Sequence, residues 1–310
     1  MLWRAASERA ARLCRPRMPD DNERDFLGAL LLDPPAAHLA WARWLRRADM
    51  PAGGSDLAPM LGARLPQLEP VPPPDLRARL HAAVMVEQRR GARIAEILAH
   101  CQTRFAAAAL PALLIDGPVP SASDGLLALR HSARLAFLLP AATDGRRAAA
   151  ALLESGLAVP VPAARLPGRH VLRHQSGLPI HLHAERLPPP FGAFSFARLS
   201  EALSADGDLR AADRLALALA DGMRSGAGGR DLRWIADVAL LLRSADRQRL
   251  NLWLTMDPIG SFLSAAFAVV GRVVPGLCIP VPPPAATPRT LLTAVRLRGR
   301  RAVLAALLRA

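Results

Sequence analysis

The chain has 310 residues, of which 51% are hydrophobic, 21% are charged and 4% are aromatic. This composition supplies enough apolar residues for a sizeable core and excludes the intrinsically disordered class. The formal net charge of +14 comes entirely from arginine, because the sequence has no lysine, and GC-rich coding produces such a bias without selecting an acidic partner.

The first 75 residues predict a helical segment. Residues 23–32 and 36–48 carry apolar side chains at three- and four-residue spacing, which is typical of amphipathic helices. A proline run at residues 70–74 interrupts this pattern. Asp75 then predicts the N-cap of a long helix over residues 76–109. Its apolar stripe consists of Leu80, Val84, Ile94, Ile97, Leu98 and Phe105.

The middle of the chain changes to short apolar or alternating runs bounded by glycine and proline. Such runs predict strands, and we expect them to form one sheet. The four predicted strands are residues 113–115, 135–139, 170–174 and 180–185. A helix over residues 145–155 is predicted between the second and third of them, and Gly156 ends it.

Helical periodicity returns after the proline run at residues 188–190. The predicted helices cover residues 209–223, 232–244, 247–255 and 262–274. The fold class is therefore predicted as α+β, with a small mixed sheet between two helical segments. The predicted parts are residues 1–75, 76–190, 191–288 and a basic amphipathic tail at 289–310.

Several short motifs follow one another in a recognisable order. They are Leu113-Leu114-Ile115-Asp116-Gly117, Arg130, the run from Arg134 to Pro140, the helix from Ala148 to Gly156, Ile180-His181-Leu182-His183 and Arg233-Trp234-Ile235-Ala236-Asp237. From about residue 20 to residue 282, this order resembles that of a family of uncharacterised bacterial nucleotidyltransferases. The resemblance implies a nucleotidyltransferase-type sheet core with helical flanks.

The resemblance also implies where the chemistry should lie. Catalytic relatives hold two Mg²⁺ ions with an Asp-x-Asp pair and a third carboxylate, since Mg²⁺ prefers oxygen ligands. Those positions hold Arg134, Ala136 and His181 here, and the lysine of a Lys-Gly turn is replaced by Asp116. We therefore expect the catalytic metal site to be lost and no cofactor to be needed.

Nucleotide binding remains a separate expectation. The resemblance places Asp116 and Gly117 near the nucleotide phosphates, and Arg130 and Arg134 offer guanidinium groups, which pair well with phosphate. The function predicted first is a pseudoenzyme that binds a nucleotide, or a protein of the same pathway, as a binding or scaffolding component of bacterial biosynthesis.

Two alternatives stay open. An active nucleotidyltransferase would use Mg²⁺ held by relocated carboxylates, such as Glu154, Glu185 or Asp116. A basic nucleic-acid-binding protein would need a continuous arginine-lined face, but the arginines are dispersed and aromatic residues are sparse. Ser132, His131 and Asp144 lack the sequence pattern of a hydrolase nucleophile and do not favour that class.

Four histidines near the predicted hairpin suggest a further possibility. A two-residue turn at Ser176-Gly177 would place His170 opposite His183. All four histidines would then share one face of the sheet, and imidazoles suit Zn²⁺, Ni²⁺ or Cu²⁺. The histidines concerned are His170, His174, His181 and His183. The competing interpretation is that His183 is a buried histidine typical of the family and that the other three are ordinary polar strand residues.

The remaining signals concern location. The three cysteines are far apart and form no Cys-x-x-Cys motif, which favours a reducing cytoplasm. Residues 1–18 are arginine-rich without a continuous apolar stretch, so they do not read as a secretory signal. The longest apolar run, residues 259–270, is shorter than the ~18 residues that a membrane-spanning helix needs. A cytoplasmic protein without a transmembrane segment is expected.

Overall fold

The computed structural model describes residues 18–118, 125–161, 169–187, 191–204, 207–225, 231–256, 259–275 and 277. The chain divides into two compact units. One unit is Ala78–Arg210 and contains the sheet, and the other combines Met1–Arg77 with Ala211–Ala310. The two helical segments that flank the sheet in the sequence therefore belong to the same unit.

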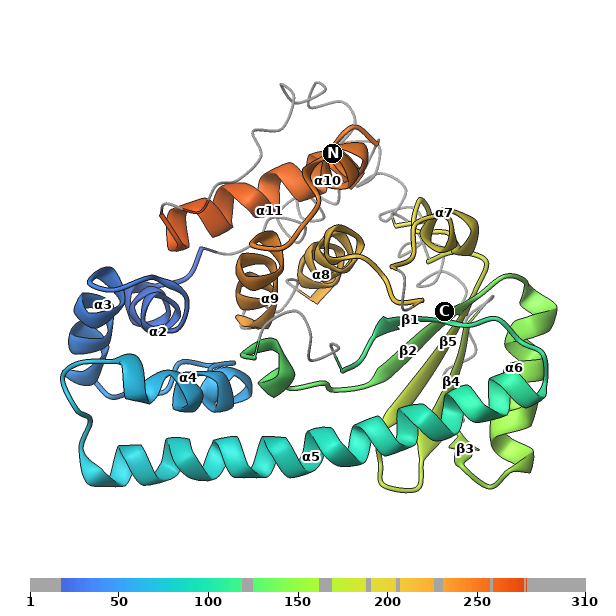
Figure 1. Cartoon of the computed structure of the whole chain (residues 1–310), viewed down its shortest axis with the longest axis horizontal. Helices are drawn as coiled ribbons and strands as arrows, with labels where there is room; N and C mark the ends of the chain where they lie inside the picture. Colours follow the sequence, from blue (N-terminus) through green and yellow to red (C-terminus); the bar gives the residue numbers. More distant parts are fainter. Residues whose placement is uncertain are drawn as a thin grey trace, which may run out of the picture. The chain divides into compact units, whose positions relative to one another are not determined.

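The helical unit begins with α2 (Asp21–Leu31), α3 (Ala36–Leu45) and α4 (Ala58–Arg64), with short 3-10 turns at Ser55–Leu57 and Leu65–Gln67 (Figure 1). A capping box starts α2, because Asp20 accepts a hydrogen bond from the backbone N–H of Glu23 and the Glu23 carboxylate accepts one in return. Trp41, Trp44 and Phe26 pack as a buried aromatic group between α2 and α3. Both predicted helices are confirmed, whereas α4 was not predicted.

In its described residues, the second part of this unit contains four helices, all of them predicted, whereas the predicted tail at 289–310 lies outside the described residues. They are α8 (Ala211–Ser225), α9 (Arg233–Leu242), α10 (Arg247–Leu254) and α11 (Ile259–Val273). The buried carboxylate of Asp213 joins two of these helices by accepting hydrogen bonds from Arg249 and from the indole N–H of Trp253. Within the described ranges, no helix combines the length and the apolar character that crossing a bilayer requires.

The sheet unit contains five strands in the order β1-β2-β5-β4-β3. They are β1 (Leu113–Asp116), β2 (Leu135–Leu139), β3 (Ala158–Pro160), β4 (Arg169–His174) and β5 (Pro179–Ala184). β2 and β5 are parallel, and the other neighbours are antiparallel. The α+β class and the four predicted strands are confirmed, and β3 is an additional edge strand.

Two helices cover one face of this sheet. The 34-residue α5 (Pro74–Ala107) contributes its second half, and α6 (Ala142–Glu154) lies beside it (Figure 1). The core contains Ile94, Ile97, Cys101 and Phe105 from α5, Ala148, Ala149 and Leu152 from α6, and Leu135, Phe137, Leu139, Ile180 and Leu182 from the strands. Asp75 lies inside the first turn of α5 and not at its N-cap. The rest of the unit includes a 3-10 turn at Leu127–Leu129 and the short α7 (Phe196–Ser200).

Strand alternation gives the opposite face a different composition. Leu135, Phe137 and Leu139 point into the core, so Ala136 belongs to the other face. Ala136 pairs in register with His181 of β5 on one side and with Asp116 of β1 on the other. The positions that the resemblance singled out therefore lie side by side on neighbouring strands.

The hairpin between β4 and β5 differs from the prediction by one residue. His170 pairs with Leu182, and His183 pairs with Arg169. Three residues form the loop instead of two, because the backbone N–H of His174 donates to the carbonyl of Leu178 across it. Gly177 takes a φ of +89°, the left-handed conformation that glycine adopts at little cost in three-residue hairpin loops.

This register corrects the predicted arrangement of the four histidines. His170 and His174 belong to the face covered by α5 and α6, whereas His181 and His183 belong to the opposite face. The prediction that all four share one face is wrong, because one extra loop residue moves every side chain of a strand to the other side.

Candidate functional site

An acidic side chain at the end of β1 is held between two arginines. Asp116 Oδ2 lies 2.8 Å from Arg134 Nε, and Asp116 Oδ1 lies 3.4 Å from Arg130 Nη1. Each carboxylate oxygen therefore faces a different guanidinium group. We call Asp116, Arg130 and Arg134 the Asp116 cluster. Its side chains are mostly but not fully buried, with 16–22% of their surface exposed.

Local structure explains how these residues meet. The pairing of β1 with β2 shifts between Leu114 and Asp116, so that Asp116 stands opposite Ala136. Arg134 precedes β2 directly, and Arg130 follows the 3-10 turn Leu127–Leu129. The β1–β2 pairing and one short connecting segment thus bring together all three members of the cluster.

A second pair of polar side chains lies on the same face. Arg169 Nη2 is 3.0 Å from His181 Nδ1 and 3.4 Å from His181 Nε2. Arginine has no acceptor, so the imidazole must accept this hydrogen bond with an unprotonated nitrogen. The neighbouring His183 is buried and contacts the His181 ring edge-on, with 6.3 Å between the ring centroids.

These side chains supply few of the oxygen ligands that a magnesium site needs. Mg²⁺ requires anionic oxygen ligands in octahedral geometry. Ala136 has no donor atom, the carboxylate of Asp116 is engaged by two guanidinium groups, and a ring nitrogen of His181 is engaged by Arg169. A divalent ion about 4 Å from one guanidinium would be repelled by ~8 kcal/mol at an effective dielectric near 20. In the part of the chain that the structure describes, no three His, Cys, Asp or Glu residues could hold a metal ion together.

Gly117 follows the cluster directly and is fixed by packing. A Cβ atom at this position would lie 3.0 Å from Leu135 Cδ2 and 3.1 Å from Leu114 Cδ1. The backbone therefore passes close to the sheet, where only glycine fits without displacing its neighbours. The segment that follows, residues 119–124, lies outside the described residues.

A buried acid on α5 holds the segment that carries both arginines of the cluster. Glu87 is 5% exposed, and its carboxylate lies 2.9 Å from His131 Nδ1 and 3.0 Å from Arg90 Nη1. Arg90 also donates to the backbone carbonyl of Ser132. Burial raises the pKa of Glu87, but the hydrogen bonds and charges of His131 and Arg90 outweigh it and hold the pKa below the ordinary 4.5. We call this arrangement the Glu87 clamp.

The clamp was not predicted from the sequence, although a signal was present. Glu87 lies three residues after Val84 and seven before Ile94. This spacing places Glu87 on the apolar stripe of α5, at a position that faces the core. A carboxylate at such a position requires partners when it is buried. The same contacts separate the three residues considered for a hydrolase, because His131 binds Glu87 while Asp144 pairs with Arg147 on α6.

The carboxylates considered as relocated metal ligands do not converge. Glu154 ends α6, a helix on the covered side of the sheet. Glu185 is exposed and follows β5, four residues beyond His181. At ~3.3 Å per residue it lies about 13 Å further along the strand direction than the position beside Asp116.

Comparisons with known proteins agree with this architecture. The family model described as uncharacterised nucleotidyltransferase matches residues 41–258, more than two thirds of the chain. The match contains the whole sheet unit and extends into helical segments on both sides. No curated protein and no solved structure matches the chain. The chain belongs to the uncharacterised nucleotidyltransferase family.

Proposed function

We propose that this chain is a catalytically degraded member of its family that binds a nucleotide without transferring it. The binding site would be on the face of the sheet opposite α5 and α6, at the Asp116 cluster and the neighbouring Arg169. The ligand would be recognised through its phosphates, and it would be neither cleaved nor joined to an acceptor.

One observation carries the proposal: the 2.8 Å ion pair between Arg134 Nε and Asp116 Oδ2, next to the Ala136–His181 register pair. Catalytic relatives have an Asp-x-Asp pair in place of Arg134 and Ala136. Here a guanidinium replaces one carboxylate and a methyl group replaces the other. The positive charge that metal ions supply in those relatives is supplied by arginine side chains instead.

The chemistry of arginine supports a phosphate ligand. A guanidinium stays charged at any physiological pH and presents its donors in a planar fork that matches two phosphate oxygens. Arg130 and Arg134 both contact Asp116, and Arg169 is directed toward His181 on the same face. Three guanidinium groups and one carboxylate give the described part of this face a net positive charge.

The same chemistry argues against transfer. Two-metal nucleotidyl transfer requires carboxylates that bind both ions and activate the attacking oxygen. Arg134, Ala136 and His181 offer no carboxylate, and Asp116 is already paired with two cations. A chain that binds nucleotide in this way would serve as a binding or scaffolding component in a biosynthetic pathway, with a protein of that pathway as its partner.

The experiment is a titration of the full chain with each of the four ribonucleoside triphosphates, in Mg²⁺ and in EDTA. We expect binding that is equally strong under both conditions and no release of pyrophosphate. Salt should weaken the binding, because partly exposed charges make the contacts. Magnesium-dependent release of pyrophosphate would overturn the proposal and favour an active enzyme.

Matched variants locate the site. Arg134→Gln and Arg130→Gln should each weaken nucleotide binding by about tenfold or more, the effect of losing one charge-assisted hydrogen bond. Arg146→Gln, on the exposed side of α6, removes the same charge away from the cluster and should leave binding unchanged. Equal affinities for all three variants and the wild-type protein would contradict the assignment of the site.

A further inference from the structure

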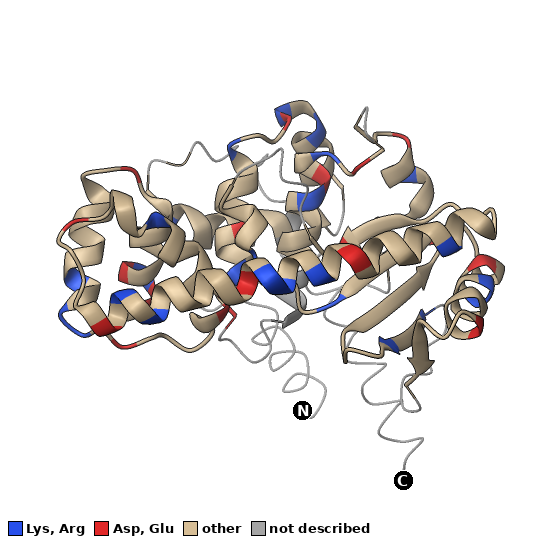
Figure 2. Ribbon diagram, turned by 60° about the horizontal axis from the view of Figure 1, so that its bottom comes forward, with Lys and Arg blue, Asp and Glu red and all other residues tan. Residues whose placement is uncertain are grey.

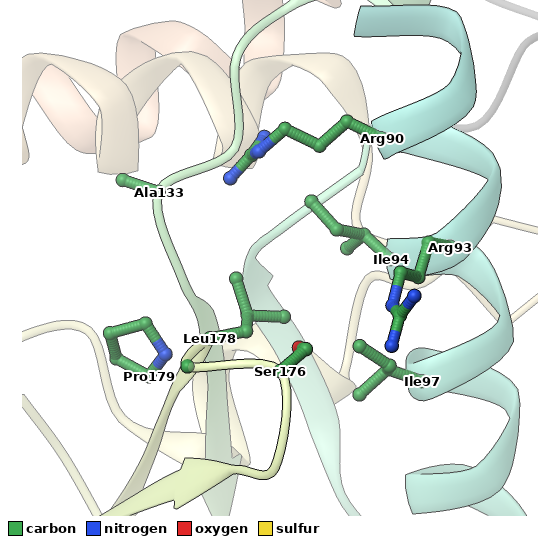
Figure 3. A pocket seen from close by; sticks show the side chains of 9 residues that line it. Arg90, Arg93, Ile94, Ile97, Ala133, Ser176, Leu178 and Pro179 are labelled. Carbon is green, nitrogen blue, oxygen red and sulfur yellow. The ribbon is translucent and has the colours of Figure 1, made fainter. Parts of the chain in front are cut away.

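A cavity lies within the sheet unit, between α5 and the loop that joins β4 to β5 (Figure 3). Its volume is about 540 Å³, which is within the usual range of small-molecule sites. At ~30 Å³ per water molecule, this space corresponds to roughly 18 waters. It is therefore large enough for a small organic molecule and too small for a folded partner. It shares no lining residue with the Asp116 cluster.

One wall of the cavity is apolar. Ile94 and Ile97 project from α5, and Leu178 and Pro179 face them from the start of β5 (Figure 3). Both isoleucines and Leu178 are at most 7% exposed, so the wall is continuous with the core of the sheet unit. Such a wall favours an apolar group over water.

The other side of the cavity is cationic. Arg90 and Arg93 are three residues apart on α5 and therefore lie on neighbouring parts of one helix surface. Figure 2 shows several blue segments in the middle of α5, with red segments beside them. Arg90 is engaged by the Glu87 clamp, whereas Arg93 forms no ion pair or hydrogen bond with any residue that the structure describes. Among the described residues no acidic side chain lines the cavity, and Ser176 adds a hydroxyl group.

The pKa of a neighbouring histidine responds to the charges around the cavity. His174, at the end of β4, hydrogen-bonds to Ser176. Burial lowers the pKa of His174, and the positive charges of Arg93 and His100 lower it further. Burial, the largest cause, disfavours a charge of either sign, whereas the charge of Arg93 disfavours only a positive one and would favour a bound anion.

We propose that this cavity binds a small amphiphilic anion, either a carboxylate or a phosphate monoester with a compact apolar body. The apolar body packs against Ile94, Ile97 and Leu178, and the anionic group binds Arg93 with support from Arg90. The site is separate from the proposed nucleotide site, since it lies on the side of the sheet that α5 covers.

Four probes distinguish the two components of this recognition. 1-Naphthyl phosphate and 1-naphthoate carry both an apolar ring system and an anion, 1-naphthol carries only the ring system, and inorganic phosphate carries only the anion. Calorimetric titration of the full chain should detect binding of one or both amphiphilic anions and much weaker binding of 1-naphthol and phosphate. The stronger of the two anions then identifies the class of headgroup.

Variants test the location. Arg93→Gln should weaken binding of the amphiphilic anion by about tenfold, whereas Arg89→Gln, an equal charge change at an exposed position of α5 outside the cavity, should not. Ala133→Trp places a large ring at the exposed edge of the cavity and should block binding without changing any charge. Circular dichroism and thermal melting establish that each variant is folded.

Three results would overturn the proposal. The first is that none of the probes binds the wild-type chain at millimolar concentration. The second is unchanged affinity in Arg93→Gln, which exchanges an exposed side chain and leaves the core intact. The third is a loss of binding in Arg130→Gln but not in Arg93→Gln, which would place the anion at the Asp116 cluster instead.

Discussion

On one face of the sheet, Leu135, Phe137 and Leu139 pack against α5 and α6, whereas Arg134 and Ala136 belong to the opposite face. The two sets alternate along the same strand, so they share one backbone and one register. The face covered by α5 and α6 holds the large apolar core residues, and the opposite face carries the polar residues of the proposed binding site. Substitutions on one face, such as those that we propose removed the metal-binding carboxylates, can therefore leave the fold intact.

The largest effect should come from the covered face. Phe137 is fully buried and meets Phe105 edge-on, with 5.1 Å between the ring centroids. Phe137→Ala should lower the free energy of unfolding by about 3–5 kcal/mol, because it removes buried apolar surface and leaves a cavity. Urea denaturation measures this difference.

The matched change on the opposite face is Arg134→Gln. It removes a partly exposed ion pair, so it should cost no more than ~1 kcal/mol. Similar losses of stability for Phe137→Ala and Arg134→Gln would show that both faces of the sheet contribute equally to folding.

The Glu87 clamp joins α5, on the covered side, to the segment that carries both arginines of the Asp116 cluster. Glu87→Gln should cost about 1–3 kcal/mol at neutral pH, because Arg90 and His131 lose a buried charged acceptor. It should also weaken nucleotide binding, since Arg130 and Arg134 lose part of their support.

The pH dependence of this effect has a defined sign. The folded state holds the pKa of Glu87 below 4.5, so the stabilisation is complete above pH 4.5 and is lost as the pH falls through the folded pKa. The difference between wild type and Glu87→Gln should therefore shrink in acid. Glu96→Gln, at an exposed position of the same helix, is the control and should show little difference at any pH.

The β4–β5 loop decides which face each hairpin residue occupies. Gly177→Ala should cost about 1–2 kcal/mol, because alanine is disfavoured at a φ of +89°. Gly91→Ala should have the opposite sign and stabilise the chain by ~0.5–1 kcal/mol, since Gly91 lies within α5 and a Cβ there meets no other atom within 4 Å. Thermal unfolding of both variants compares them directly, and a neutral Gly177→Ala would contradict the importance of the loop conformation.

The last predicted effect is a gain in affinity. Asp116 competes with a bound phosphate for Arg130 and Arg134, so Asp116→Asn should tighten nucleotide binding by up to about tenfold, or ~1.4 kcal/mol. Asp144→Asn removes an equal charge beside Arg147 on α6 and should leave affinity unchanged. Weaker binding in Asp116→Asn would mean that the carboxylate positions the arginines more than it blocks them.

Much of the fold followed from local sequence patterns. The runs that became β2 and β5 are bounded by proline or glycine, and their side chains alternate or are uniformly apolar. β3 was missed because it has three residues, of which only Ala158 is buried, and it ends in proline. The hairpin register was missed because loop length is not encoded in the strands themselves, and a change of one residue reverses both faces.

The residues of the Asp116 cluster could be predicted from the sequence, but their contacts could not. Asp116, Arg130 and Arg134 were singled out because motif order placed them, but their mutual ion pairs depend on the register between β1 and β2. Glu87 and Arg169 were missed because their partners are 44 and 12 residues away in the sequence. Sequence periodicity predicts the face of a helix or strand on which a residue lies. It does not predict which side chain from a distant part of the sequence contacts that residue.

Cys101 lies beneath the sheet on α5, fully buried, and burial raises the pKa of its thiol to about 12. A thiol reagent reacts with the thiolate and must reach it, so this position reacts only when the helix separates from the strands. In a chain with serine at Cys14 and Cys278, the rate of labelling would follow the opening of the sheet unit alone. The labelling rate of Cys101 thus measures how often the sheet unit opens. A ligand that slows the labelling would bind the form in which α5 is packed on the sheet.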